Sequence, residues 1–201
     1  MSSTLLSIAY LPNIEWLAHF IQGKEIWIEA HETFQKQTYR SRALISGPQG
    51  IQVLNVPVQK QFKGIRECTV SYAENWTKDH LKAIESAYAK SPFYEVLMPD
   101  LANILNAKPQ TLWELNTRIL ELVIYWLDHP STWKATKAYQ TDFVGTDLRQ
   151  LSPKGTQTFT NTEYHQVFFS KNGFQNNLSA LDLLFNLGRS SWDYLNEQQL
   201  K

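Results

Sequence analysis

The stretch "TLLSIAYLPNIEWLAHFIQGKEIWIEA" (residues 4–30) decides the fold class. Residues 4–12 form a short, largely apolar run ended by a proline, which is typical of a buried strand. Residues 13–23 repeat apolar side chains at helical spacing, with Asn13 as a cap and Gly23 as a stop. Residues 25–30 predict a second strand. The stretch therefore predicts a β-α-β unit, in which a right-handed crossover joins two parallel strands.

A hairpin is predicted next along the chain. The extended runs 39–45 and 51–58 flank "SGPQG" (46–50), and a short linker with Gly and Pro between two such runs is a hairpin signal. Residues 66–72 predict one further strand. We expect the hairpin and the parallel strands to share one mixed sheet.

The remainder of the chain is mostly helical in pattern. Thr77, Ser91 with Pro92, and the Thr111–Glu114 capping box are candidate helix starts, and Pro99 is a candidate kink. The helices are predicted over residues 75–90, 91–107, 110–128, 177–188 and 190–198. Residues 128–163 lack a clear period and predict a long loop, a kind of segment that is often functional or mobile. The predicted fold class is α/β (mixed α+β), with the mixed sheet packed against a helix-rich C-terminal half in one domain, 1–201.

Composition narrows the class of protein. The chain has 201 residues, 43% of them hydrophobic, so it can bury a core. The 19 basic residues equal the 19 acidic ones, which argues against a nucleic-acid binder. Cys68 is the only cysteine, which excludes an intramolecular disulfide and a cysteine-based zinc site. The N-terminus is a poor signal peptide and no apolar run reaches about 18 residues, so we expect a cytoplasmic protein without a membrane span.

The stretch "HETFQKQTYRSRALI" (31–45) holds most of the candidate site residues. If residues 36–42 are extended, Lys36, Arg40 and Arg42 share one face, where they could bind a phosphate or a carboxylate. A solvated edge strand is the other interpretation, because charges on an edge discourage pairing with another sheet. His31 follows a predicted strand and could act as a general acid or base, oriented by Glu32 or Glu29.

Two further residues are candidates outside that stretch. His80 lies near the start of a predicted helix, where it could cap the helix or pack on Trp76. Asp182 interrupts an apolar helix, so it must face solvent, pair, or line a site. No metal-ligand spacing, Walker loop, G-x-G-x-x-G or G-x-S-x-G motif occurs, and the sequence leaves any cofactor unknown.

Four motifs in order resemble the WbqC-like protein family, in the short form common in Bacteroidetes. They are "AYLPNIEW", "HETFQKQTYRSRALISGPQGIQVLNVPV", "NWTKDHLKAIESAYAKSPFYE" and "YHQVFFSKNGFQNNLSALDLLFNLG". The family pattern falls on Pro12, Lys36, Gln37, Tyr39, Arg40, Arg42, Trp76, His80, Tyr88, Pro92, Gln166, Asn177, Ser179, Asp182 and Asn186. The chain departs from it at Ser41 and Ala43, where the family often reads "YRNRC", and at Arg189, where it often has proline.

The resemblance implies a role in surface-polysaccharide (O-antigen) biosynthesis, with a suggested glycine transfer. The first hypothesis is therefore an aminoacyl or acyl transferase acting on a sugar, whose small-molecule substrate is anionic or a sugar. Its candidate catalytic residues are His31, His80 and Asp182, and its candidate anion- or substrate-binding residues are Lys36, Gln37, Tyr39, Arg40 and Arg42. The alternative is a non-catalytic carbohydrate- or protein-binding module, with the seven Trp forming the binding surface.

Overall fold

A parallel sheet begins the fold, as the sequence predicts. The computed structural model describes residues 3–59, 64–128, 132–154 and 158–200. Strand β1 (Ser3–Ser7), helix α1 (Ile14–Gln22) and strand β2 (Ile26–Glu29) form the β-α-β unit, with Leu5 of β1 opposite Trp27 of β2. The parallel unit is confirmed.

Two short strands that the sequence did not reveal extend this sheet. They are β5 (Trp133–Ala135) and β6 (Gly145–Asp147), and the order β5-β2-β1-β6 is parallel throughout. Both lie in the segment that was predicted to be a loop. Three residues are too few to display a period of two, and it is pairing with β1 and β2 that makes these segments strands.

The hairpin is confirmed, but it forms a sheet of its own. Strand β3 (Arg42–Gly47) pairs antiparallel with β4 (Gly50–Asn55), and Gly50 takes a φ of +106° at the turn. The described residues therefore form two sheets in place of the predicted mixed one, within the mixed α+β class that the sequence predicts. Residues 66–72 make only isolated bridges, from Val70 to Val58 and from Thr69 to Thr111, so the strand predicted there is wrong.

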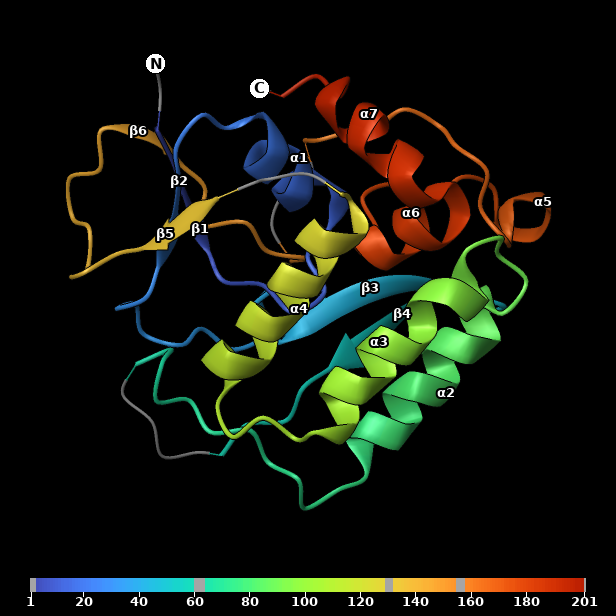
Figure 1. The fold of residues 1–201 in the computed structure, drawn as a ribbon, viewed down its shortest axis with the longest axis horizontal. Coiled ribbons are helices and arrows are strands. Elements are labelled where there is room, and N and C mark those ends of the chain that lie inside the picture. The colour runs from blue at the N-terminus through green and yellow to red at the C-terminus, as the bar shows by residue number, and fades with distance from the viewer. Residues whose placement is uncertain (1–2, 60–63, 129–131, 155–157, 201) are drawn as a thin grey trace.

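The middle helices pack beside the hairpin (Figure 1). They are α2 (Trp76–Tyr88), α3 (Tyr94–Asn106) and α4 (Leu112–Trp126). The capping box is present, since the Thr111 hydroxyl accepts from the backbone N–H of Glu114 at 3.1 Å. Ser91 is no cap, because its hydroxyl instead donates to the Tyr88 carbonyl and α3 begins later. Pro99 lies inside α3 without dividing it.

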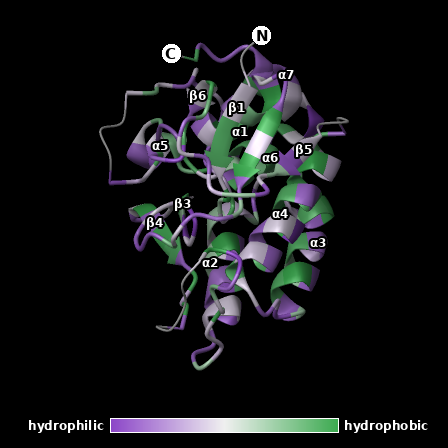
Figure 2. Ribbon diagram, turned by 90° about the vertical axis from the view of Figure 1, so that its left-hand side faces the viewer, coloured by the Kyte–Doolittle hydropathy of each residue, from purple (hydrophilic) through white to green (hydrophobic). Residues whose placement is uncertain are grey.

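The C-terminal helices are α5 (Phe169–Asn172), α6 (Ala180–Leu187), the 3-10 helix η1 (Gly188–Ser190) and α7 (Ser191–Asn196). Of these, α6 and α7 pack on α1, and α5 lies beside the turn of the hairpin, where Asn172 Nδ2 donates to the Gly47 carbonyl at 3.0 Å. Figure 2 shows α1, α6 and α7 gathered with the sheet, and both chain ends lying at that end of the molecule. Helix α6 is buried from Ala180 to Asn186, and its side chains belong to one hydrophobic cluster that also includes residues of β1, α2 and α4.

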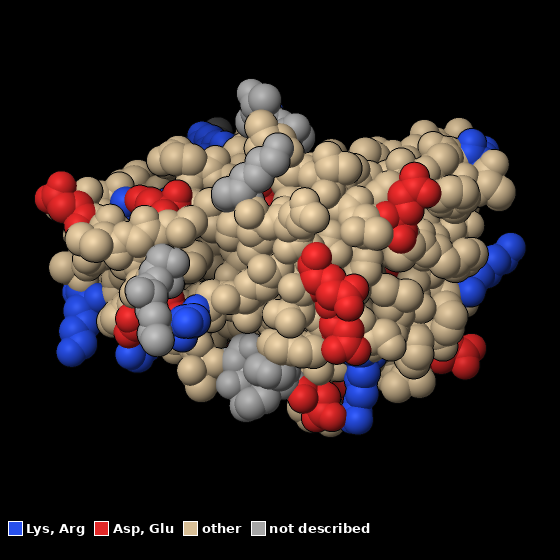
Figure 3. Space-filling view, turned by 90° about the horizontal axis from the view of Figure 1, so that it is seen from above, with Lys and Arg blue, Asp and Glu red and all other residues tan. Residues whose placement is uncertain are grey.

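Surface charge is mixed on the face that Figure 3 shows, where acidic and basic side chains alternate without a continuous basic area. Within the described ranges, no helix is both long and apolar enough to cross a bilayer.

Candidate functional site at the end of the parallel sheet

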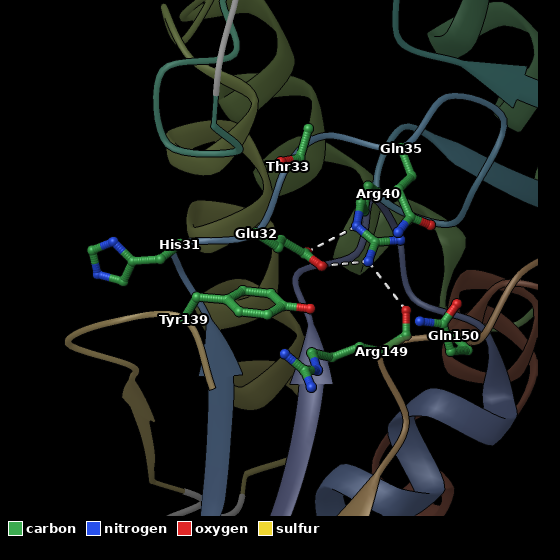
Figure 4. A pocket seen from close by; sticks show the side chains of 8 residues that line it. All are labelled: His31, Glu32, Thr33, Gln35, Arg40, Tyr139, Arg149 and Gln150. Atoms are coloured by element: carbon green, nitrogen blue, oxygen red, sulfur yellow. Dashed lines mark hydrogen bonds and ion pairs between the residues drawn. The ribbon is translucent and has the colours of Figure 1, made fainter. Parts of the chain in front are cut away.

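The strands of the parallel sheet all end at one edge, and a pocket lies there. In open parallel sheets, the carboxyl ends of the strands are where ligands bind. The pocket, hereafter the sheet-end pocket, has a volume of about 340 Å³. It is lined by His31, Glu32, Thr33, Gln35, Arg40, Tyr139, Arg149 and Gln150 (Figure 4).

A buried ion pair forms one wall of the sheet-end pocket. Arg40 is 1% exposed and Glu32 is 4% exposed. The Arg40 Nε donates to Glu32 Oε1 at 2.8 Å, and its Nη2 also donates to Glu32, to the Ser7 hydroxyl and to the Arg149 carbonyl. A fork of this kind fixes a guanidinium in both position and plane.

A second arginine forms the other wall. Arg149 follows β6, and its Nε and Nη2 donate to the carboxylate of Asp147, with the shortest distance 2.6 Å. Its Nη1 donates to Glu29 at 3.3 Å, and its guanidinium carbon lies 4.8 Å from the centre of the Tyr139 ring. The bonds from Arg149 lower the pKa of Asp147, and the Asp147 carboxylate in turn raises the pKa of Arg149. Both groups are therefore held in their charged forms.

Glu29 ties three strands together beneath the pocket. It is fully buried at the end of β2, and its carboxylate accepts from the Thr136 hydroxyl (2.6 Å), the backbone N–H of Gln140 (3.0 Å) and the backbone N–H of His31 (2.9 Å). The carboxylate thus anchors the chain after β5 and the start of the loop after β2. These contacts preorganise the backbone around the pocket.

The charges at this edge do not balance. Three carboxylates (Glu29, Glu32 and Asp147) face two guanidiniums (Arg40 and Arg149), which leaves one negative charge when all five are ionised. Every nitrogen of Arg149 and two of the three of Arg40 already donate to these residues, to Ser7 or to a carbonyl. The arrangement therefore suits hydroxyl or amino groups, which donate to carboxylates, better than a bare phosphate.

Several lining residues are exposed, and Tyr139 and His31 are the two that carry a ring. The Tyr139 side chain lies over Arg149 and is 51% exposed. The imidazole of His31 is also exposed, and Figure 4 shows it pointing away from the Glu32–Arg40 pair. These side chains are free to meet a ligand that approaches from solvent.

The predicted row of cations on one strand face is wrong. Residues 36–41 form turns, with the backbone N–H groups of Ser41 and Arg42 donating to the Thr38 carbonyl and Gln37 at a φ of +63°. Only Arg40 of the five predicted substrate-binding residues lines the pocket. Lys36 and Gln37 are exposed, Tyr39 is buried, and Arg42 on β3 donates to Asn55.

His80 lies apart from the sheet-end pocket. It is 6% exposed, with Nδ1 2.8 Å from the Tyr10 hydroxyl and its ring edge-on to Trp76, so the predicted packing on Trp76 is confirmed. Burial lowers the pKa of His80 to about 4, and it is therefore neutral at pH 7. Its catalytic role stays a prediction.

Asp182 also lies apart from that pocket. It is fully buried in α6, where its Oδ2 accepts from the Tyr164 hydroxyl at 2.5 Å and from Gln166 Nε2 at 3.0 Å. Burial raises the pKa of Asp182 to about 6, against the lowering effect of these bonds. Arg40, Arg42, His80 and Asp182 therefore do not converge on one pocket, and the catalytic role of Asp182 likewise stays a prediction.

Comparison with known proteins assigns the chain to a family. Residues 9–152 match the WbqC-like protein family, a span that includes every residue lining the sheet-end pocket. The chain belongs to the WbqC-like family. It is also similar to the uncharacterized protein Rv1507c of Mycobacterium tuberculosis, with 28% identity over 194 residues that cover 81% of this chain and 83% of that protein. No solved structure matches the chain.

Several residues of the site escaped the sequence reasoning. Asp147 ends a three-residue strand, Arg149 follows that strand and Tyr139 lies in the connection before it, and Ser7 ends β1 without any motif. The one signal that pointed to them was the unusual length of segment 128–163, which is typical of functional loops.

The described residues show no exposed cluster of Trp, the surface that the alternative function was expected to use. None of the seven Trp belongs to the exposed large apolar side chains, and all seven lie within the described residues. Trp126 is buried, and Trp113 packs partly buried against the core, edge-on to Trp133. Stacking platforms must be accessible, so the Trp set does not favour a carbohydrate-binding surface.

Within the described ranges, no group of three or more His, Cys, Asp and Glu side chains could hold a metal ion.

Proposed function

We propose that this WbqC-like protein is a transferase of surface-polysaccharide biosynthesis that binds a sugar in the sheet-end pocket. The observation that carries the proposal is the network of five charged side chains, four of them buried, around one pocket at the carboxyl end of a parallel sheet. Burying charge is costly, and such clusters concentrate at functional sites because they preorganise polar groups. The family membership supports the polysaccharide context.

The network defines what the sugar would meet. The Glu32 carboxylate accepts from sugar hydroxyl or amino groups, and the exposed Tyr139 ring offers an apolar face to the sugar ring. Arg40 is the one predicted anion-binding residue at the pocket, and it contributes its third nitrogen, Nη1, to an anionic substituent. The chemistry we propose is aminoacyl or acyl transfer to the bound sugar.

His31 is the candidate acid or base in this proposal. Its backbone is anchored to Glu29 while its imidazole stays exposed at the mouth, so the ring can turn toward a bound acceptor. An imidazole in this position is suited to removing the proton of an attacking hydroxyl or amine.

A binding series tests the assignment of the pocket. Isothermal titration of the purified protein with amino sugars, nucleotide sugars and inorganic phosphate is repeated with Tyr139→Ala. Tyr125→Ala is the matched control, because Tyr125 is 74% exposed on α4 and does not line this pocket. We expect the affinity for sugar to fall at least about tenfold in Tyr139→Ala and to stay unchanged in Tyr125→Ala. A tenfold fall corresponds to the loss of about 1.4 kcal/mol of binding free energy. Equal affinities in all three proteins would place the sugar elsewhere.

A turnover assay tests the chemistry. Each sugar that binds is incubated with aminoacyl and acyl donors, and transfer is followed by mass spectrometry. His31→Ala should bind the sugar as wild type does but lose about 10²-fold or more in rate, the usual size of a general acid–base contribution. His165→Ala, at another exposed histidine, is the control. Unchanged transfer in His31→Ala would remove His31 from the mechanism.

A further inference from the structure

A second pocket lies on the other side of the segment that follows β6. Leu148 and Leu151 line it, whereas the two residues between them, Arg149 and Gln150, line the sheet-end pocket. Its volume is about 420 Å³, and we call it the α1 pocket because helix α1 forms one wall. Its lining is Glu15, His19, Leu148, Leu151, Thr158, Phe159, Thr160 and Gln199.

Two titratable side chains of α1 share this pocket. Glu15 and His19 are four residues apart, so they lie on one face of the helix, and both are half-buried. Among the described residues, nothing hydrogen-bonds to the imidazole of His19, and Glu15 uses only its Oε2. Glu15 Oε1 and the His19 ring are therefore available to a ligand.

Asn177 holds the Glu15 carboxylate in place. Its Nδ2 donates to Glu15 Oε2 at 2.9 Å, and its Oδ1 accepts from the Glu15 backbone N–H at 3.0 Å. To reach this position Asn177 takes a φ of +55°, a conformation that costs energy for any residue except glycine, although Asn tolerates it best. A strained residue that clamps a partly buried carboxylate is typical of a site rather than of a surface helix.

The far wall of the pocket is fixed in a similar way. The chain at Phe159 has no regular secondary structure, yet the Phe159 carbonyl accepts from Asn176 Nδ2 at 2.8 Å. The Asn161 backbone N–H in turn donates to Asn176 Oδ1 at 2.9 Å. The side-chain amide of Asn176 thus fixes the backbone on either side of Thr160, and Phe159, which is 7% exposed, lines this cavity.

The electrostatics of the α1 pocket favour a cation. Among the described residues that line it there is no Lys or Arg, and Glu15 supplies the only formal charge. Burial raises the pKa of Glu15 despite the bond from Asn177, and burial lowers the pKa of His19. The carboxylate is therefore short of a positive partner, and the neutral imidazole can accept one more hydrogen bond.

We propose that the α1 pocket is a second ligand site, which binds a small primary amine with an apolar body. The ammonium group donates to Glu15 Oε1 and to the His19 ring, while the apolar body lies against Leu148, Leu151 and Phe159. The site goes beyond the sugar pocket and does not depend on it, although the shared segment 148–151 places the two ligands on opposite sides of one wall.

Benzylamine, benzyl alcohol and benzoate are the probes that test this site. They share one ring and differ in charge, and their binding to the full chain is followed by NMR shifts of the His19 ring and by equilibrium titration. We expect benzylamine to bind at least about tenfold more tightly than benzyl alcohol, and benzoate not to bind. Glu15→Gln, which keeps the bond from Asn177, should remove this preference for the amine. Glu163→Gln, at an exposed glutamate outside both pockets, should preserve it.

Two results would overturn the proposal. One is that benzylamine and benzoate bind alike, or that neither shifts the His19 ring. The other is an amine preference that survives in Glu15→Gln, because the carboxylate would then not be the acceptor. Neither result depends on the sugar titration, so the two proposals fail separately.

Discussion

Removing Arg40 should expose how strongly the buried ion pair supports the sheet-end pocket. Arg40→Met keeps most of the apolar stem but deletes the donors to Glu32, to Ser7 and to the Arg149 carbonyl. Among the described residues, the Ser7 hydroxyl, 3.0 Å away, would then be the one side-chain donor left to Glu32, which is 4% exposed. Breaking one side of a buried pair costs about 3–5 kcal/mol, because the remaining charge is uncompensated.

The loss is large relative to the stability of a typical chain. The free energy of unfolding of natural proteins is about 5–15 kcal/mol. For a chain of this size, a loss of about 1 kcal/mol of that free energy lowers the melting temperature by roughly 2–4 °C. Arg40→Met should therefore melt about 6–20 °C below wild type. Urea unfolding followed by Trp fluorescence gives the free energy directly, and the slope with urea shows whether the transition stays cooperative.

Matched variants separate the buried pair from a general effect of losing an arginine. Arg118→Met breaks the exposed pair with Glu114, whose side chains are 47% and 38% exposed, and should cost about 0.5 kcal/mol or less. The double variant Glu32→Gln with Arg40→Met should recover part of the loss, since no charge is left buried. If Arg40→Met costs no more than Arg118→Met, or if the double variant is the sum of the singles, the buried pair is not what holds this edge together.

The remaining predictions concern stability. Burial lowers the pKa of His80 to about 4, so the contribution of neutral His80 to the free energy of unfolding is lost as pH falls from about 6.5 to about 4. When the free energy of unfolding is measured with urea at each pH, His80→Phe should show a smaller change than wild type across that window. Burial raises the pKa of Asp182 from 3.8 to about 6, so the contribution of protonated Asp182 to the free energy of unfolding is full below pH 3.8 and is lost as pH rises to about 6. The free energy of unfolding of wild type, relative to that of Asp182→Asn, should therefore fall across that window. Gly145 has a φ of +149°, and a Cβ there would lie 2.2 Å from the Ser3 carbonyl oxygen. Gly145→Ala should therefore lower the free energy of unfolding by about 1–3 kcal/mol or more and loosen β6. Gly64→Ala, where a Cβ would meet nothing nearer than 3.9 Å, should leave the melting temperature nearly unchanged.

Local patterns were enough to predict the elements whose cause is local. The helical spacing of apolar residues between two apolar runs predicts helix α1 and the β-α-β unit. The capping box at Thr111 predicts the start of α4. The hairpin follows from one Gly- and Pro-containing linker. The motifs also led to the WbqC-like family, and the matched residues 9–152 contain the whole lining of the sheet-end pocket.

Long-range pairing decided the elements that the patterns missed. Residues 66–72 have strand composition but make only isolated bridges, whereas β5 and β6 have little strand character and pair fully with β2 and β1. The segment at Arg40 turns at Thr38 instead of extending, so Lys36 and Arg42 point to places other than the pocket. For β5 and β6, strands distant in sequence supply the hydrogen bonds that fix the backbone, whereas the turn at Thr38 is closed by local bonds from Ser41 and Arg42.

The sequence by itself determined the fold class, the helix–strand order of the first 60 residues and the family. It also singled out Arg40 and His31, because charge and motif are readable residue by residue. Only the tertiary structure decided that Arg40 pairs with Glu32, that Arg149 arrives from 109 residues away to offer its carbonyl, and that Asp182 and His80 lie elsewhere. The physical reason is that a buried charge takes whichever partner the packed chain brings within bonding distance, and separation along the sequence carries no record of that distance.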